Sequence, residues 1–285
     1  MLWADKFAFV AAVFLLVVIV LALIGPHWLA DLAGKQNLRG RNLPPFDWTR
    51  EWVYWLGADA LGRPLLARII VASQNTLMVA AGAVALSAVV GTFLGLIAGF
   101  SGPRVSQVIM RLADVIMSFP SLLIAVIVLY LLGSSILNLV AVLAITRIPV
   151  YLRTTRAEAL EIRERMFVQA ARVMGASGRR ILFRHILPVV LPTLTTLATL
   201  DFAYVMLAES ALSFLGIGIQ PPEITWGLMI SQGRQYLTNA WWLSFWPGLA
   251  IILTTLSLNL LSNWMRIALD PVQRWRLEMK GRKNG

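Results

Sequence analysis

The stretch QNTLMVAAGAVALSAVVGTFLGLIAGF, residues 74–100, contains no charged side chain. It is longer than the roughly 20 apolar residues that a helix needs to cross a bilayer. Gly91, Gly95 and Gly99 recur at four-residue spacing, which lets the backbone of a neighbouring helix approach closely. This stretch therefore predicts a membrane-spanning helix that packs tightly against a second helix.

The composition of the whole chain is also typical of a membrane protein. Of its 285 residues 58% are hydrophobic, whereas soluble domains are about half apolar. The sequence has no cysteine, and His27 and His185 are its two histidines, so disulfides and haem or zinc sites are not expected. We interpret the net charge of +11 as charge in cytoplasmic loops and not as a nucleic-acid surface.

Apolar runs predict an all-α, polytopic membrane protein with about six membrane-spanning helices. The first run is too long for the apolar core of a secretory signal, so we interpret it as a retained anchor. We divide the chain into an anchor with an extracytoplasmic segment (1–72), a membrane core (73–267) and a basic tail (268–285). The third run is expected to break near Phe119-Pro120. The six runs are 7–24, 74–100, 105–132, 136–152, 186–215 and 243–267.

The positions of the basic residues predict the orientation of the chain. Six spans place both termini on the same side of the membrane. More than half of the 25 Lys and Arg residues fall on that side, at the two termini, near 101–111 and in the insert 153–185. Because cytoplasmic loops carry excess Lys and Arg, we expect both termini in the cytoplasm.

The basic insert 153–185 interleaves Glu and Arg at helical spacing, which favours local ion pairs. We expect one helix to leave the membrane and end near Arg165, and a shorter helix to follow over 167–174, with Gly175 at its C-cap. A groove on a cytoplasmic partner and the surface of anionic lipid fit the apolar face of the short helix equally well. That face carries Phe167, Ala170, Ala171 and Met174.

Part of the insert resembles a known signature. Gln169-Ala170-Ala171, followed by Gly175 and Leu187-Pro188, is similar to the EAA…G…LP motif of ABC importer permeases, with the same gap between the glycine and the Leu-Pro pair. Gln169 stands where that motif has Glu, and His185 stands where Ile is frequent.

The resemblance extends over about residues 55–271. Six stretches, in order and spacing, look like the C-type permease subunit of the group that imports dipeptides, oligopeptides, opines and nickel chelates. Asn263 and Ile267 depart from this group, which commonly shows Asp there. The stretches are WLGADALGRPLLARII (55–70), GLIAGFSG (95–102), MRLADVIMSFP (110–120), AARVMGASGRRILFRHILP (170–188), ESALSFLGIGIQPPEITWGLMISQGRQYL (209–237) and FWPGLAI…LNLLSNWMRIALDP (245–271).

This resemblance implies a type I ABC importer permease fold in a bacterial inner membrane. It implies a heterodimer with a second permease chain, two cytoplasmic ATPase subunits that hold ATP and Mg, and an extracytoplasmic solute-binding protein. No cofactor is implied on this chain, and without a G-x-x-x-x-G-K-[ST] loop it is not expected to be the ATPase itself. The outer loop 216–242 is either a surface for the binding protein and an outer gate or a packed re-entrant loop.

The resemblance also implies that a coupling helix at 166–182 docks on the ATPase. The residues that it assigns to docking are Phe167, Gln169, Ala170, Ala171, Met174, Gly175, Arg179 and Arg180.

Ionisable residues inside membrane spans are costly, at about 3 kcal/mol near a helix centre. For Asp114 we favour an ion pair with Arg111, one turn earlier, over a contact with solute. Arg147, Asp201 and Glu209 are candidate pathway or inter-subunit contacts; the last two lie about two turns apart on one face. A membrane enzyme or a stand-alone channel is a remote alternative, because no catalytic motif accompanies these charges.

Overall fold

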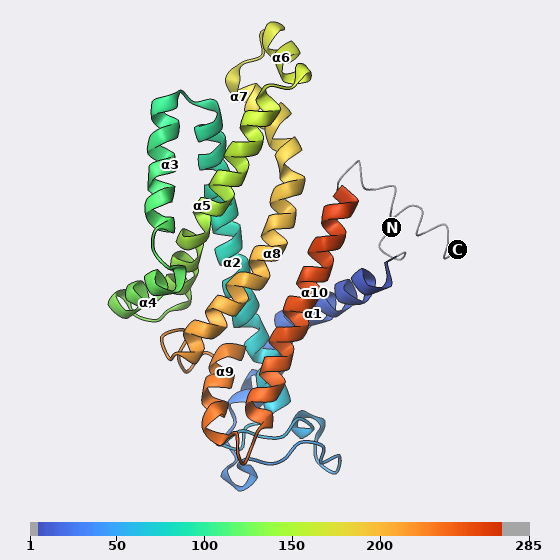
Figure 1. The fold of residues 1–285 in the computed structure, drawn as a ribbon. Helices are drawn as coiled ribbons and strands as arrows, with labels where there is room; N and C mark the ends of the chain where they lie inside the picture. The colour runs from blue at the N-terminus through green and yellow to red at the C-terminus, as the bar shows by residue number, and fades with distance from the viewer. Residues whose placement is uncertain (1–4, 270–285) are drawn as a thin grey trace, which may run out of the picture.

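The computed structural model describes residues 5–269, and within them the regular structure is helical (Figure 1). Residues 166–181, which form α6 and α7, lie at one end of the molecule, and the segment between α1 and α2 lies at the opposite end with α9. The α-helices are α1 (Lys6–Gly34), α2 (Leu65–Phe100), α3 (Pro103–Met117), α4 (Ser121–Leu132), α5 (Ile136–Arg163), α6 (Met166–Val173), α7 (Gly178–Ile181), α8 (Leu187–Phe214), α9 (Trp226–Gly233) and α10 (Trp242–Leu269).

The predicted all-α fold with about six spans is confirmed. Five helical stretches are long and apolar enough to cross a membrane, namely α1, α2, α5, the run Gly178–Phe214 and α10 up to Ala268. α3 and α4 make a sixth if they count as one bent span. The predicted break lies between them, and the two helices meet at an angle of 82°. Pro120 follows the last turn of α3 and keeps the residue before it out of the helical region.

The first span is longer than the sequence predicts. α1 continues through Gly25-Pro26 to Gly34, although a proline inside a helix removes one hydrogen bond and strains the preceding turn. Gly25 packs against α2, where a Cβ in its place would lie 2.2 Å from Cγ2 of Ile70. The packing between α1 and α2 therefore keeps the helix intact beyond the expected end.

The second span begins at Leu65 and not at Gln74 as predicted. The extra turns include Arg68, which the sequence places in the segment before the span. Its side chain is almost completely buried and lies near the carboxylate of Asp59. A charge with a partner can be accommodated in a helix, so α2 reaches 36 residues.

The glycine repeat of α2 packs against α5, which is the most extensive helix contact in the described structure. A Cβ on Gly91 would lie 2.5 Å from Cβ of Tyr151, and one on Gly95 would lie 2.6 Å from Cβ of Thr155. The residue numbers of the contacting positions increase together along both helices, so α2 and α5 run parallel. The predicted close approach of two backbones is confirmed, and the main core lies around this pair.

The outer segment between α1 and α2 folds on short 3₁₀ turns, Leu38–Gly40 and Trp52–Tyr54. Trp48 and Trp55 pack edge to face with ring centroids 5.1 Å apart and remain exposed. Val53 is buried in a small cluster with residues of α1 and α2. The segment is therefore a folded loop with a core of its own and with tryptophans on its surface.

Candidate coupling helix and buried charges

Helix α6 stands at the tip of the molecule, where α5 ends and α7 begins (Figure 1). Gly175 adopts a left-handed backbone, with φ of +83°. The backbone N–H of Gly175 donates to the carbonyl of Arg172, and the N–H of Ala176 donates to that of Ala171, both at 3.0 Å. This pattern is a Schellman motif. The predicted role of Gly175 at the end of the helix is confirmed.

The inward face of α6 is made by Val168 and Ala171, which are buried. Val168 belongs to a cluster with Ile162 of α5 and Ile181 of α7. The sequence places Ala171 on the docking face, and the structure turns its side chain into the chain itself. Ala171 therefore supports α6 from below and does not offer a surface to a partner.

The outward face of α6 is apolar and exposed. Met174 is 81% exposed and Val173 is 89% exposed, while Phe167 is less open at 43%. Met166 is also exposed, at 85%, and Ala170 lies on this side too. The structure thus adds Met166 and Val173 to the predicted surface, because a helix of eight residues makes about two turns and presents more than a single stripe.

Gln169 occupies the position at which the resemblance leads one to expect Glu. Its side-chain amide donates to the backbone carbonyl of Glu164 at 3.1 Å, which satisfies an orphan carbonyl at the end of α5. A carboxylate has no proton to donate at neutral pH, so this contact requires the amide. Gln169 therefore ties α6 to the end of α5.

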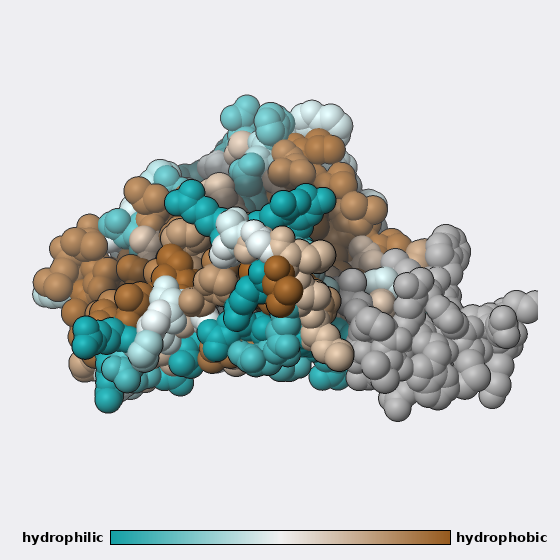
Figure 2. All heavy atoms as spheres, turned by 90° about the horizontal axis from the view of Figure 1, so that it is seen from above, coloured by the Kyte–Doolittle hydropathy of each residue, from teal (hydrophilic) through white to brown (hydrophobic). Residues whose placement is uncertain are grey.

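The segment that contains α6 and α7 also carries exposed arginines. Glu161 and Arg165 form the predicted local ion pair at 2.9 Å. In contrast, Arg172, Arg179 and Arg180 have no carboxylate within 4.0 Å among residues 5–269. Seen from this end of the molecule (Figure 2), hydrophilic side chains stand among hydrophobic ones. The tip therefore combines exposed apolar side chains with arginines that have no carboxylate partner in the part of the chain that the structure describes.

Beyond the turn at Gly175, the link from α6 to the membrane is continuous helix from α7 onward. A five-residue π-helix, Leu182–Ile186, joins α7 to α8. Gly178–Phe214 is therefore one continuous helical run. α5 and α8 therefore hold α6 from both sides.

Arg147 of α5 and Asp201 of α8 form an ion pair, with Nε of Arg147 3.3 Å from Oδ2 of Asp201. The guanidinium also lies over the ring of Tyr204, 4.4 Å from its centroid. The hydroxyl of Tyr204 is 3.0 Å from Oγ of Ser121 on α4. Asp201 is thus occupied by a partner within the chain, and this cluster joins three helices.

Glu209 is completely buried on α8. Its carboxylate accepts hydrogen bonds from Oγ of Ser213 at 2.7 Å and from Oγ of Ser210 at 3.4 Å. These are neighbours on the same helix, so the hydroxyls solvate the carboxyl locally. The structure does not bring Glu209 to the ion pair of Asp201.

Asp114 pairs with Arg153 of α5, at 2.5 Å, and not with Arg111. The prediction of an ion pair within α3 is wrong, because a helix pattern reveals only neighbours along one helix. Both side chains of the observed pair are more than 40% exposed. The contact ties α3 to the α2–α5 pair at the edge of the molecule.

Comparison with known proteins assigns the chain. Residues 91–275 match the family described as "Binding-protein-dependent transport system inner membrane component". The chain belongs to this family. The family is one of membrane permease subunits, and the match covers α6 with its flanking spans α5 and α8.

Several named relatives of this permease are similar over most of their length. The di/tripeptide transport system permease protein DppC of Pseudomonas aeruginosa is 39% identical, over 94% of this chain and 88% of its own. The probable D,D-dipeptide transport system permease protein DdpC of Escherichia coli is 36% identical, over 92% and 87%. The glutathione transport system permease protein GsiD of Pectobacterium atrosepticum is 37% identical, over 76% and 72%.

The fold of the permease is similar to a chain in an inward-facing structure of the MetNI methionine ABC transporter. The TM-score is 0.60 at 16% sequence identity, and the match covers 73% of this chain and 98% of that chain. At this identity the likeness concerns the fold alone, which agrees with the type I ABC importer permease fold that the sequence predicts.

Proposed function

We propose that this permease is one of two membrane chains of an ATP-driven, binding-protein-dependent importer of dipeptides and oligopeptides. Family membership supports the class of transporter, and the names of the relatives support the peptide solutes. The observation that carries the docking role is the tip of the molecule. There Val173 and Met174 are exposed at the end of α6. Arg172, Arg179 and Arg180 have no carboxylate within 4.0 Å in the described part of the chain, residues 5–269.

In this proposal two cytoplasmic ATPase subunits bind ATP with Mg and grip the α6 tip of each permease chain. The second permease is a homologous chain, and an extracytoplasmic protein delivers the solute from the opposite side. The sequence contains no phosphate-binding loop of the G-x-x-x-x-G-K-[ST] type. The work of ATP hydrolysis therefore falls to the partner subunits.

The length of α5 is enough to hold α6 outside the hydrocarbon of the bilayer. α5 has 28 residues, so it extends about 42 Å at 1.5 Å per residue. The hydrocarbon core of a bilayer is about 30 Å thick. α6 is therefore held beyond the hydrocarbon, where a cytoplasmic protein can enclose its exposed side chains.

Movement at α6 would be transmitted through α5 and α8. The two helices are connected to α6 at either end and to each other through Arg147 and Asp201. If ATP binds one conformation of the ATPase dimer more tightly than the other, it shifts the equilibrium between them. The permease helices then follow as rigid bodies and open the pathway to alternate sides.

The test is co-purification of the full chain with candidate ATPase subunits. We expect Met174→Glu to reduce retention of the ATPase at least tenfold, because it puts a charge into an apolar contact. Leu38→Glu is the matched control, since Leu38 is also exposed but lies at the opposite end. Equal retention by both variants would remove the docking role of α6.

The solute is tested separately, on the protein that delivers it. We expect the cognate extracytoplasmic binding protein to retain dipeptides or oligopeptides. Retention of a nickel chelate or an opine would contradict the peptide assignment and leave the docking assignment intact.

A further inference from the structure

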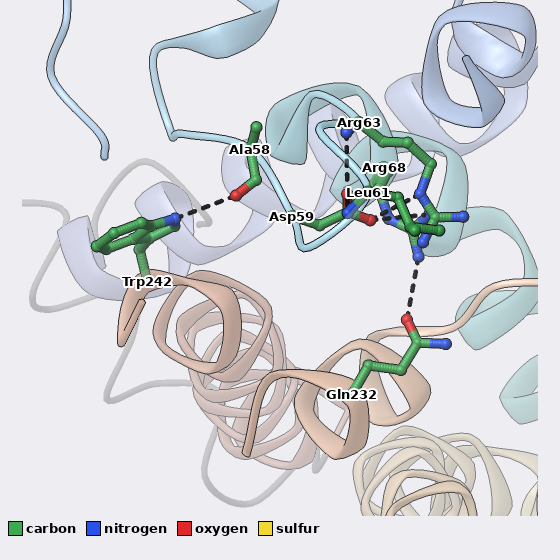
Figure 3. A network of polar contacts seen from close by, with 7 residues as sticks. All are labelled: Ala58, Asp59, Leu61, Arg63, Arg68, Gln232 and Trp242. Atoms are coloured by element: carbon green, nitrogen blue, oxygen red, sulfur yellow. Dashed lines mark hydrogen bonds and ion pairs between the residues drawn. The ribbon is translucent and has the colours of Figure 1, made fainter. Parts of the chain in front are cut away.

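A cavity of about 290 Å³ lies at the end of the molecule opposite to α6. It is bounded by the turn before α2, by the first turn of α2 and by α9 with the start of α10. Figure 3 shows Arg63 and Arg68 gathered around Asp59, with Gln232 of α9 on the facing side. The sequence did not single out this site, because Arg68 was expected in a loop outside the second span.

Arg68 has more hydrogen-bond donors than acceptors around it. Its guanidinium carries five N–H groups, and its side chain is almost completely buried. One donor reaches Oε1 of Gln232 at 3.3 Å, and another nitrogen lies 3.6 Å from Oδ2 of Asp59. No other hydrogen bond or ion pair of this guanidinium occurs within residues 5–269.

Asp59 is already committed to other groups. Its Oδ2 accepts from Nε of Arg63 at 2.7 Å, and its Oδ1 accepts from the backbone N–H groups of Leu61 and Arg63 at 2.9 Å. Two guanidinium groups thus share one carboxylate, which leaves one positive charge in excess. A buried cation without full pairing is costly, so the cavity has the electrostatics of an anion site.

The rest of the lining selects among anions. Leu65 of α2 and Met229 of α9 are buried apolar residues in the lining of the cavity, and Leu243 adds a third. Such a surface suits a short apolar group better than a bare inorganic ion. A guanidinium fork matches the two oxygens of a carboxylate.

We propose that this cavity binds the carboxylate end of a small organic solute, with the short apolar part of the solute against Leu65 and Met229. Arg68 then completes its hydrogen bonds with the bound carboxylate. The proposal rests on the proposed function in one respect, namely that the solute arrives from the side of the membrane opposite to α6. It names a contact that the solute makes on this chain before it enters the membrane.

The test is calorimetric binding of N-acetyl-L-leucine to the full chain in lipid nanodiscs. N-acetyl-L-leucinamide is the matched probe, because it keeps the apolar group and lacks the charge. We expect the acid to bind at least tenfold more tightly than the amide, and we expect Arg68→Gln to abolish that preference. Equal affinity for acid and amide, or an unchanged preference in Arg68→Gln, would overturn the proposal.

Two further variants separate loss of the site from loss of folding. Met229→Trp fills the cavity while Arg68 remains, and it should weaken binding of the acid at least tenfold. Arg50→Gln removes an exposed arginine that pairs with Asp47 outside the cavity, and it should bind the acid normally. Retained acid binding in Met229→Trp would contradict the location of the site.

An acidic side chain of the extracytoplasmic binding protein also carries a carboxylate, so it could occupy the cavity in place of the solute. If the small acid fails to bind while Arg68→Gln weakens docking of that protein, the cavity is a protein contact and the proposal is wrong. These measurements need no ATPase. A negative result therefore leaves the proposed function standing, and Met174→Glu, which tests that function, should bind the acid normally.

Discussion

Arg147 and Asp201 show how single residues in the membrane are stabilised within this chain. Asp201 is buried, and Arg147 keeps about a fifth of its side chain exposed beside Tyr204. An ionised group inside a span is costly unless it is paired. The pair removes that cost and at the same time fixes α5 against α8.

We expect Arg147→Met and Asp201→Asn each to lower the free energy of unfolding by about 3–5 kcal/mol, because each leaves a buried partner unpaired. The double variant should lose less than the sum, with a coupling of roughly 0.5–3 kcal/mol. Chemical unfolding in detergent measures all three. Additive losses would show that the two side chains do not stabilise one another.

Asp114 and Arg153 provide the matched control for that cycle, since they also join α5 to another helix but are well exposed. Exposed ion pairs contribute about 0–1 kcal/mol. Asp114→Asn should therefore change the unfolding free energy by less than about 1 kcal/mol. A loss as large as that of Asp201→Asn would mean that burial does not set the difference.

The residue-scale predictions from sequence succeed where the partner is close along the chain. Glu161 with Arg165 was predicted from helix spacing, whereas the partner of Asp114 lies on another helix. No pattern within α3 can reveal Arg153, because helix–helix register is set by packing. For the same reason the sequence assigned Ala171 to the wrong side of α6.

Among the elements, α6 depends on its C-terminal turn. Gly175 has φ of +83° and no other group within 4 Å of a Cβ placed on it. A residue with a side chain at position 175 is therefore disfavoured by the left-handed backbone conformation and not by steric crowding. The left-handed conformation costs non-glycine residues about 1–2 kcal/mol, and Asn tolerates it better than β-branched residues.

We expect Gly175→Val to increase hydrogen exchange of the backbone amides in 166–176 at least tenfold, since the end of α6 opens more often. Gly175→Asn should exchange at nearly the wild-type rate. Exchange followed by mass spectrometry on the full chain measures both. Equal protection in the two variants would mean that the left-handed turn does not hold α6 in place.

The sequence located well those element boundaries that a helix-breaking residue marks. The break between α3 and α4 was predictable, because Pro120 disfavours helical backbone at the residue before it. The angle of 82° between the two helices was not predictable. α1 exceeds its predicted bound because packing against α2 keeps the helix intact beyond Pro26, and α2 exceeds its bound because Asp59 is a partner for the charge of Arg68. Apolar periodicity indicates which segment can form a membrane-spanning helix. It does not indicate how far contacts with neighbouring segments extend that helix.

At the scale of the whole molecule, the parallel packing of α2 and α5 fixes how the chain crosses the membrane. The nearest neighbours of Gly91 and Gly99 on α5 are Tyr151 and Ala159, so both helices end on the α6 side. The chain must return to the opposite side between them, which makes the bent pair α3–α4 a crossing. Ser134, after α4, accordingly donates a hydrogen bond to the carbonyl of Ile217 beyond the end of α8.

This arrangement predicts that the two ends of the molecule face opposite sides of the membrane, with the arginine-rich α6 tip in the cytoplasm. The chain has no cysteine, so single cysteines report without background. A membrane-impermeant maleimide should label Leu38→Cys in right-side-out vesicles and Met174→Cys in inverted vesicles alone. Both positions are more than 60% exposed, so unequal burial does not explain a difference. Labelling of both from one side would contradict the crossing at α3–α4, and the reverse pattern would place the α6 tip outside, where no ATPase can reach it.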